Sequence, residues 1–174
     1  MLVSVTKCPD KHFRRYVDGC IQFCAEALID NKKILNNLII NVKFDPNLSV
    51  LGYASIDGYN TMNHPREFLI EVNPDIGARG ILETLTHEMV HVKQYINGEI
   101  DETLKFWKGR KFDSDSNDYY SHPWEIEAIG ISEGLFTKYV EKEKLWKVFN
   151  GIYNPKIKSR AMKLGWKNPP DFRS

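Results

Sequence analysis

Two histidines four residues apart, His87 and His91, constrain this chain more than any other feature of its sequence, because Glu88 directly follows the first of them. A helix places residues at this spacing on one face, about one turn apart, where both imidazole rings can share a metal ion. Glu88 then lies beside the ion and can take a proton from a water that the ion holds. The H-E-x-x-H spacing therefore predicts a helical zinc site with the chemistry of a hydrolase.

The residues around this motif predict one long helix, which begins at Asn73 or Asp75 and ends at Asn97-Gly98. At about 100° per residue, its apolar side chains fall on one stripe. The stripe consists of Leu82, Leu85, Met89, Val92 and Ile96. His87 and His91 point to nearly the opposite side. We therefore expect the stripe to pack on a sheet and the two histidines to lie at the floor of a cleft.

The residues before this helix predict an α+β fold. An N-terminal helix is expected from Asp10, as its N-cap, to Asp30-Asn31. Runs of β-branched and apolar residues then predict three strands, at residues 38–44, 50–56 and 68–73. The strand around Tyr53 is expected at an edge of the sheet above the cleft, where an extended peptide could add as a further strand. We thus expect an N-terminal helix, a small mixed sheet of at least three strands, the helix with the motif, and a mostly helical C-terminal part.

A zinc ion held by two histidines needs a third protein ligand, and a catalytic ion keeps its fourth position for water. A second helix is predicted from Pro123, which suits a first helical position, to about Val140. Glu125 in its first turn is the preferred ligand. Glu127 points about 200° away from it, so only one of the two can face the ion. His122, just before the helix, is the rival third ligand.

The H-E-x-x-H motif and the later run Glu125-Ile126-Glu127-Ala128 together resemble the zincin metallopeptidases of the glutamate-ligand type, the gluzincins, several of which carry E-x-x-A on a second helix. The run from Thr86 to Val92 is also similar to the SprT-like zinc peptidases of bacteria and phages. The resemblance implies a zincin-like fold and hydrolysis of peptide bonds. It aligns Glu125, and not Glu127, with the metal ligand.

By this resemblance, His87, His91 and Glu125 would bind zinc, and Glu88 would be the general base that activates the zinc-bound water. Thermolysin-like enzymes place an aspartate four residues after the glutamate ligand, where this chain has Ile129. The motif therefore does not identify the group that orients the histidines.

A long connection, residues 99–121, joins the two helices. Residues 104–112 within it predict a small hairpin around Lys108-Gly109-Arg110, and the length of the connection is typical of a lid. The oxyanion that forms during hydrolysis needs a second hydrogen-bond donor. Tyr119 and Tyr120, just ahead of the second helix, are the candidates, and Tyr120 is the expected catalytic residue.

The 174 residues are enough for one domain with a small extension, which we place at residues 1–140 and 141–174. Residues 138–174 carry ten basic and three acidic side chains with interleaved aromatics. Such a tail could bind nucleic acid or fold across the cleft, although a polypeptide substrate is favoured.

The N-terminus does not have the pattern of a signal peptide, no run approaches the ~20 apolar residues of a membrane span, and the three cysteines suit a reduced core. These features predict a cytoplasmic protein without membrane contact.

The leading prediction is thus a zinc-dependent peptidase. The alternatives are a nucleic-acid-associated SprT-like protein whose basic tail binds DNA and a non-catalytic zinc-binding interaction domain.

Overall fold

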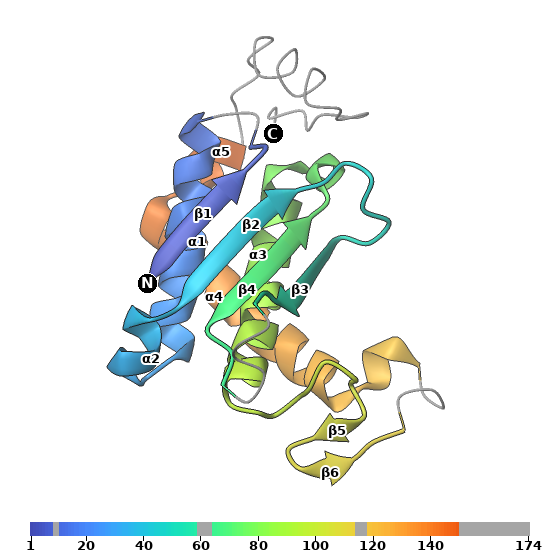
Figure 1. Cartoon of the computed structure of the whole chain (residues 1–174). Coiled ribbons are helices and arrows are strands. Elements are labelled where there is room, and N and C mark those ends of the chain that lie inside the picture. Colours follow the sequence, from blue (N-terminus) through green and yellow to red (C-terminus); the bar gives the residue numbers. More distant parts are fainter. Residues whose placement is uncertain (9–10, 59–63, 114–117, 150–174) are drawn as a thin grey trace.

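A four-stranded mixed sheet with helices on one face forms the body of the protein (Figure 1). The computed structural model describes residues 1–8, 11–58, 64–113 and 118–149. The strands lie in the order β1 (Leu2–Thr6), β2 (Ile39–Phe44), β4 (Glu67–Val72) and β3 (Gly52–Ile56). β1, β2 and β4 are parallel, whereas β3 is antiparallel to β4 and forms the end of the sheet. The fold is therefore α+β, as the sequence predicts, and β3 is the expected edge strand.

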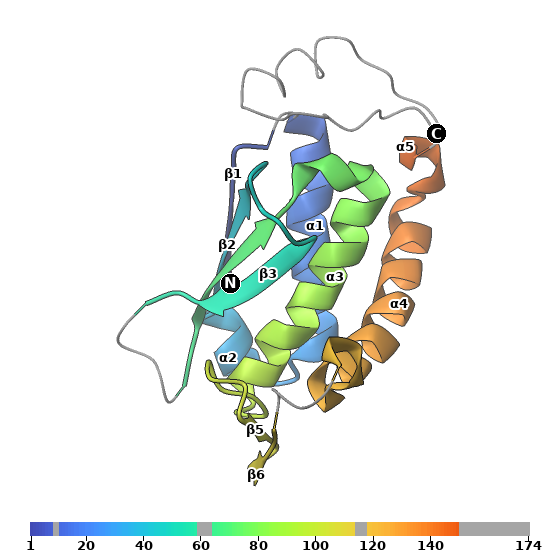
Figure 2. The same ribbon diagram turned by 90° about the vertical axis from the view of Figure 1, so that its right-hand side faces the viewer.

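Three long helices complete the body. They are α1 (Lys11–Leu28), α3 (Gly77–Ile96) and α4 (Pro123–Glu143). Figure 2 shows the sheet, then α1 and α3, then α4 on the far side of α3. The shorter elements are α2 (Lys32–Asn36), η1 (Pro74–Ile76), η2 (Tyr119–Ser121) and α5 (Trp146–Phe149). Because α3 lies between the sheet and α4, nearly its whole length is buried.

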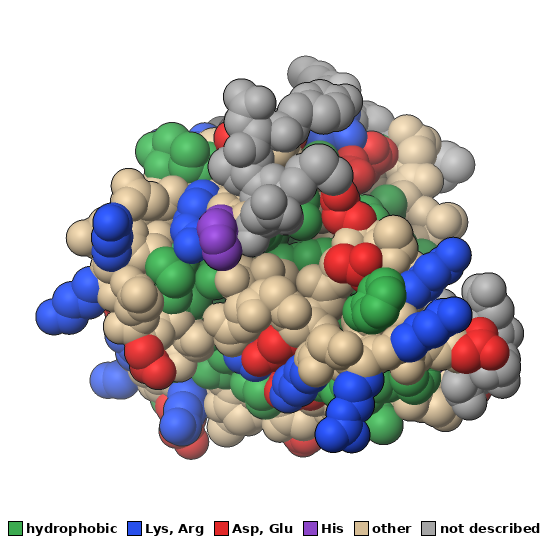
Figure 3. All heavy atoms as spheres, turned by 60° about the horizontal axis from the view of Figure 1, so that its bottom comes forward, with side chains coloured by type: hydrophobic (Ala, Val, Ile, Leu, Met, Phe, Trp, Pro, Cys, Tyr) green, Lys and Arg blue, Asp and Glu red, His purple; other side chains and the backbone are tan. Residues whose placement is uncertain are grey.

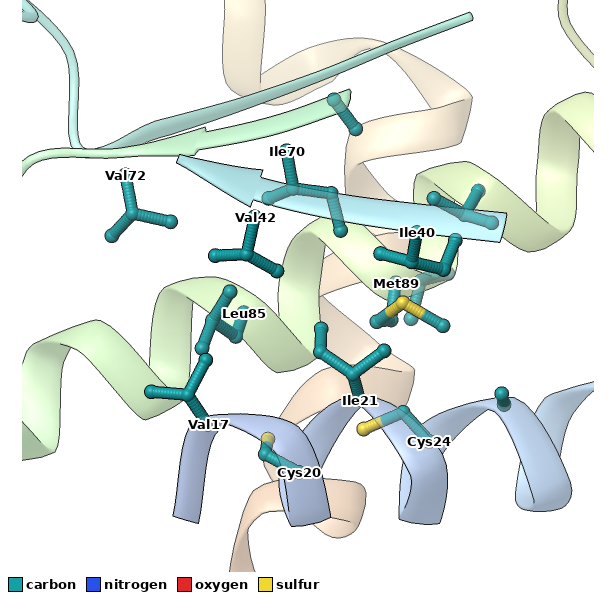
Figure 4. Packing of buried hydrophobic residues seen from close by; sticks show 14 of the residues in the cluster. Val17, Cys20, Ile21, Cys24, Ile40, Val42, Ile70, Val72, Leu85 and Met89 are labelled. Atoms are coloured by element: carbon teal, nitrogen blue, oxygen red, sulfur yellow. The ribbon is translucent and has the colours of Figure 1, made fainter. Parts of the chain in front are cut away.

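The core forms between one face of the sheet and the helices. In β2 and β4, alternate side chains are buried, so each strand has one packed face and one half-exposed face. Val42 of β2 pairs with Ile70 of β4, and both face Leu85 and Met89 of α3 (Figure 4). The apolar stripe predicted for the motif helix is therefore its buried face. Cys20 and Cys24 of α1 are free and buried in the same core, as expected.

Two elements near the N-terminus were not predicted from the sequence. The chain begins with β1 rather than with a helix, and β1 pairs in parallel with β2 along its whole length. α2 is a single short helix whose N-cap is Asn31, with a side chain that accepts hydrogen bonds from the backbone of Lys33 and Ile34. The predicted N-cap Asp10 of the first long helix lies outside the described residues.

The connection between α3 and α4 contains the predicted hairpin, made of β5 (Phe106–Trp107) and β6 (Arg110–Lys111). Its two turn residues, Lys108 and Gly109, have φ values of 48° and 78°. A two-residue turn with positive φ at both positions matches the right-handed twist of the flanking strands. The role of this hairpin as a lid stays a prediction.

α4 continues past the predicted domain limit at residue 140 and ends at Glu143, and its C-cap residue Lys144 has a left-handed backbone. Leu145 follows and is fully buried. Most of the basic tail, residues 150–174, lies outside the part of the chain that the structure describes, so the tail and its partners stay predictions. Among the described helices, none combines the length and the apolar character that crossing a bilayer requires.

Candidate metal centre

The candidate site lies where α3 meets the first turn of α4. The apolar stripe of α3 packs against the sheet and α1, and the opposite side of the helix faces α4. His87 and His91 are on that side. Pro123 starts α4 and places Glu125 in its first turn, opposite the two histidines.

Three side chains converge at this junction. His87 Nε2 and His91 Nε2 are 3.0 Å apart, and their rings meet at 82°. Glu125 Oε2 lies 3.2 Å from His87 Nε2, and Glu125 Oε1 lies 3.4 Å from His91 Nε2. Within the described residues, these three side chains are the one group of three or more His, Cys, Asp or Glu that could hold a metal ion.

The two imidazole groups and the carboxylate together suit a divalent cation. Glu125 is 3% exposed, and its buried Oε2 has no hydrogen bond despite its short distance from His87. Two facing imidazole nitrogens can share only one proton, which leaves the buried carboxylate oxygen unsatisfied. A cation coordinated by both nitrogens and the carboxylate would satisfy all three groups, and this donor set suits zinc.

Glu125 is ionised at neutral pH. Burial raises the pKa of its carboxyl group, but the nearby His87 and His91 imidazoles and a hydrogen bond from the Tyr119 side chain outweigh burial. The pKa of Glu125 therefore lies well below its usual range. An ionised carboxylate is the form that binds a metal.

Glu88 lies on the same helix but points toward β3. It is buried, it accepts a backbone hydrogen bond from Ala54, and a Cβ atom at Gly52 would lie 3.2 Å from its Oε1. Burial raises the pKa of Glu88, and the neighbouring His91 and His87 only partly oppose this shift. Glu88 is thus held between the metal-ligand candidates and the edge strand, in an environment that helps it to carry a proton.

The two tyrosines before α4 differ in position. The side chain of Tyr119 hydrogen-bonds to Glu125, whereas Tyr120 is 68% exposed and has its ring packed against that of Tyr119. Burial, followed by the hydrogen bond to Glu125, raises the pKa of Tyr119, so its hydroxyl keeps its proton. The structure therefore brings Tyr119, rather than the expected Tyr120, into contact with Glu125 of the three converging side chains.

The two rival ligands lie elsewhere. Glu127 binds Lys93 at 3.4 Å and Lys108 at 3.0 Å. His122 is buried with its ring 4.6 Å from that of Trp124. Neither belongs to the group formed by the two motif histidines and Glu125.

Sequence reasoning missed the group that orients His91. Gln94 Oε1 lies 2.8 Å from His91 Nδ1, on the side of the ring away from the converging atoms. Gln94 is three residues after His91 on the same helix, a spacing at which side chains are neighbours. This spacing was the signal available in the sequence.

Comparison of the chain with protein-family models, with curated proteins and with solved structures gave no match.

Proposed function

We propose that this protein is a zinc-dependent metallopeptidase with a zincin-like fold. His87, His91 and Glu125 would hold the ion, and Glu88 would be the general base. The observation that carries the proposal is the convergence of two imidazole nitrogens and a buried, hydrogen-bond-deficient carboxylate oxygen, with a second buried carboxylate from the same motif beside them. A site that served only to crosslink α3 and α4 would not need Glu88.

Each residue has a role that follows from its surroundings. A bound zinc ion would polarise the carbonyl of the scissile bond and acidify a water at the site. The Glu88 carboxylate would accept the proton from the attacking water and pass it to the leaving amine. The raised pKa of its buried carboxyl group favours this proton transfer. The Tyr119 hydroxyl keeps its proton, and it would donate to the developing oxyanion by transferring its hydrogen bond from Glu125.

The position of β3 supports a polypeptide as the substrate. β3 is the end strand of the sheet, and its residues Gly52 and Ala54 lie against Glu88. Tyr53 between them is 53% exposed. An extended peptide that added to this edge would bind through backbone hydrogen bonds and would pass beside the general base.

The decisive experiment combines metal analysis with hydrolysis of an unfolded protein substrate by the full chain. The wild type is expected to bind about one zinc ion and to cleave the substrate. Glu88→Gln should keep zinc and lose about 10²- to 10⁴-fold in kcat, because only the proton acceptor is removed. Glu83→Gln, a matched substitution on a partly exposed glutamate of α3 that pairs with Arg79, should keep most of the activity.

Either of two results would overturn the proposal. One is a wild-type chain that binds no zinc when zinc is supplied, and the other is a Glu88→Gln chain with wild-type activity. A zinc-loaded wild type that cleaves nothing would favour the non-catalytic interaction domain instead.

The DNA-binding alternative depends on residues outside the described part of the chain. On the face nearest the β5–β6 hairpin, acidic and basic side chains are mixed and do not form separate charged patches (Figure 3).

A further inference from the structure

Gln94 is a fully buried amide with three polar partners at the junction of α3 and α4. Its Oε1 lies 2.8 Å from His91 Nδ1. Its Nε2 donates to Glu127 Oε2 at 2.8 Å and to the Trp124 carbonyl at 3.0 Å. Gln94 has no solvent contact, so these three partners account for its hydrogen bonding.

The partners of Gln94 decide which way its amide points. A backbone carbonyl and a carboxylate can only accept hydrogen bonds, so the NH2 group must face Trp124 and Glu127. The amide oxygen must then face His91. A flipped amide would set its oxygen against the Glu127 carboxylate and against the buried Trp124 carbonyl, and both hydrogen bonds would be lost.

The orientation of the amide in turn decides the tautomer of His91. Gln94 Oε1 can only accept, so His91 Nδ1 must carry the proton that is donated to it. In the neutral imidazole, Nε2 then has a free lone pair. That nitrogen is the one that faces His87 and Glu125.

We infer that Gln94 is a positioning residue that fixes the Nδ1-protonated tautomer of His91 and so presents Nε2 to a metal ion before the ion binds. Glu127 and the Trp124 carbonyl are the groups that impose this orientation on Gln94. Glu127 is itself held by Lys108 in the turn of the β5–β6 hairpin and by Lys93 of α3. The inference rests on the proposed function only in taking His91 as a ligand.

The tautomer can be read in the wild-type, metal-free protein. Long-range ¹H–¹⁵N correlation spectra at alkaline pH distinguish a protonated Nδ1 from a protonated Nε2. The expected result is that His91 is protonated at Nδ1. A His91 that is protonated mainly at Nε2 would overturn the inference, and no substitution is needed for this test.

Two variants then test the consequence for zinc affinity, measured by competition with a chromophoric chelator. Gln94→Met keeps the size of the side chain and removes the acceptor, so zinc should bind about 10- to 100-fold more weakly. In Gln94→Glu combined with Glu127→Gln, the residue at 94 still accepts from His91 and the residue at 127 can donate to it, but the Trp124 carbonyl loses its donor. This double variant should recover part of the lost affinity, and its His91 should remain protonated at Nδ1.

A control separates positioning from general loosening of the helix packing. Tyr139→Phe removes a half-buried hydrogen bond from α4 to the Tyr16 carbonyl of α1, away from the site. It should lower stability and leave zinc affinity unchanged. The inference would be contradicted if Gln94→Met bound zinc with the affinity of the wild type, within about twofold. If the wild type binds no zinc at all, the proposed function fails, whereas the tautomer of metal-free His91 still decides the inference about Gln94.

Discussion

The two sides of α3 are buried by different kinds of contact. Toward the sheet and α1 the helix presents fully buried apolar side chains, such as Leu85 and Met89. Toward β3 and α4 it presents Glu88, His91 and Gln94, which are also buried but polar. We call these the apolar side and the polar side of α3.

Burial has opposite energetic consequences on the two sides. Each buried apolar side chain stabilises the fold by about 1.5–3 kcal/mol. A buried carboxylate or imidazole costs free energy unless partners compensate for its desolvation. The apolar side therefore accounts for folding, whereas the polar side is explained by the site that it forms.

The largest effect on stability is expected on the apolar side. Leu85→Ala should lower the free energy of unfolding by about 2–5 kcal/mol, because it leaves a cavity in a close-packed core. Leu51→Ala is the control: Leu51 is 62% exposed, and its loss should cost at most about 0.5 kcal/mol. Urea unfolding in the presence of a chelator measures both variants. Similar costs for both would show that α3 does not pack on the sheet as described.

Zinc should stabilise the fold only through the polar side of α3. At a free concentration of about 100 times its Kd, zinc should raise the free energy of unfolding by about 2.7 kcal/mol, because it binds the folded chain. His87→Ala should abolish this increase. Leu85→Ala should show the same increase as the wild type, since its defect lies on the other side of the helix. An increase that persisted in His87→Ala would place the metal elsewhere.

Local periodicity explains which parts of the site could be predicted. His87 and His91 face one way because i and i+4 are one helical turn apart, and this relation holds before any tertiary contact forms. The same reasoning separated Glu125 from Glu127, and in the structure Glu125 belongs to the group with the two histidines whereas Glu127 does not. The strand at 52–56 was identifiable from its composition, and its place at the edge follows from the sheet order.

The missed features depend on contacts between distant residues or on short elements. β1 has one fully buried side chain, Val5, so its sequence carries little apolar pattern. The role of Gln94 becomes visible only when the Trp124 carbonyl is known to lie against it. Tyr119 and Tyr120 are adjacent in a single 3-10 turn, and their different directions cannot be derived from periodicity.

A smaller effect is expected where β3 crosses α3 beside Glu88. A Cβ atom at Gly52 would lie 2.3 Å from Thr84 Cγ2, so Gly52→Ala should destabilise the fold by about 1–3 kcal/mol. Gly130→Ala is the matched control, because Gly130 lies in α4 with nothing within 4 Å of a built Cβ. In a helix that substitution should stabilise the fold by about 0.5–1 kcal/mol. Equal effects of the two substitutions would mean that β3 does not approach α3 so closely.

A second substitution separates stability from activity at this crossing. Thr84→Ala removes the Cγ2 atom that the new methyl group would meet, so Gly52→Ala combined with Thr84→Ala should recover most of the lost stability. The added Cβ would still lie 3.2 Å from Glu88 Oε1, which is tight for a carboxylate that must reach the substrate. Hydrolysis should therefore remain below that of Thr84→Ala alone. If activity recovers together with stability, the close packing of β3 matters for the fold and not for the placement of Glu88.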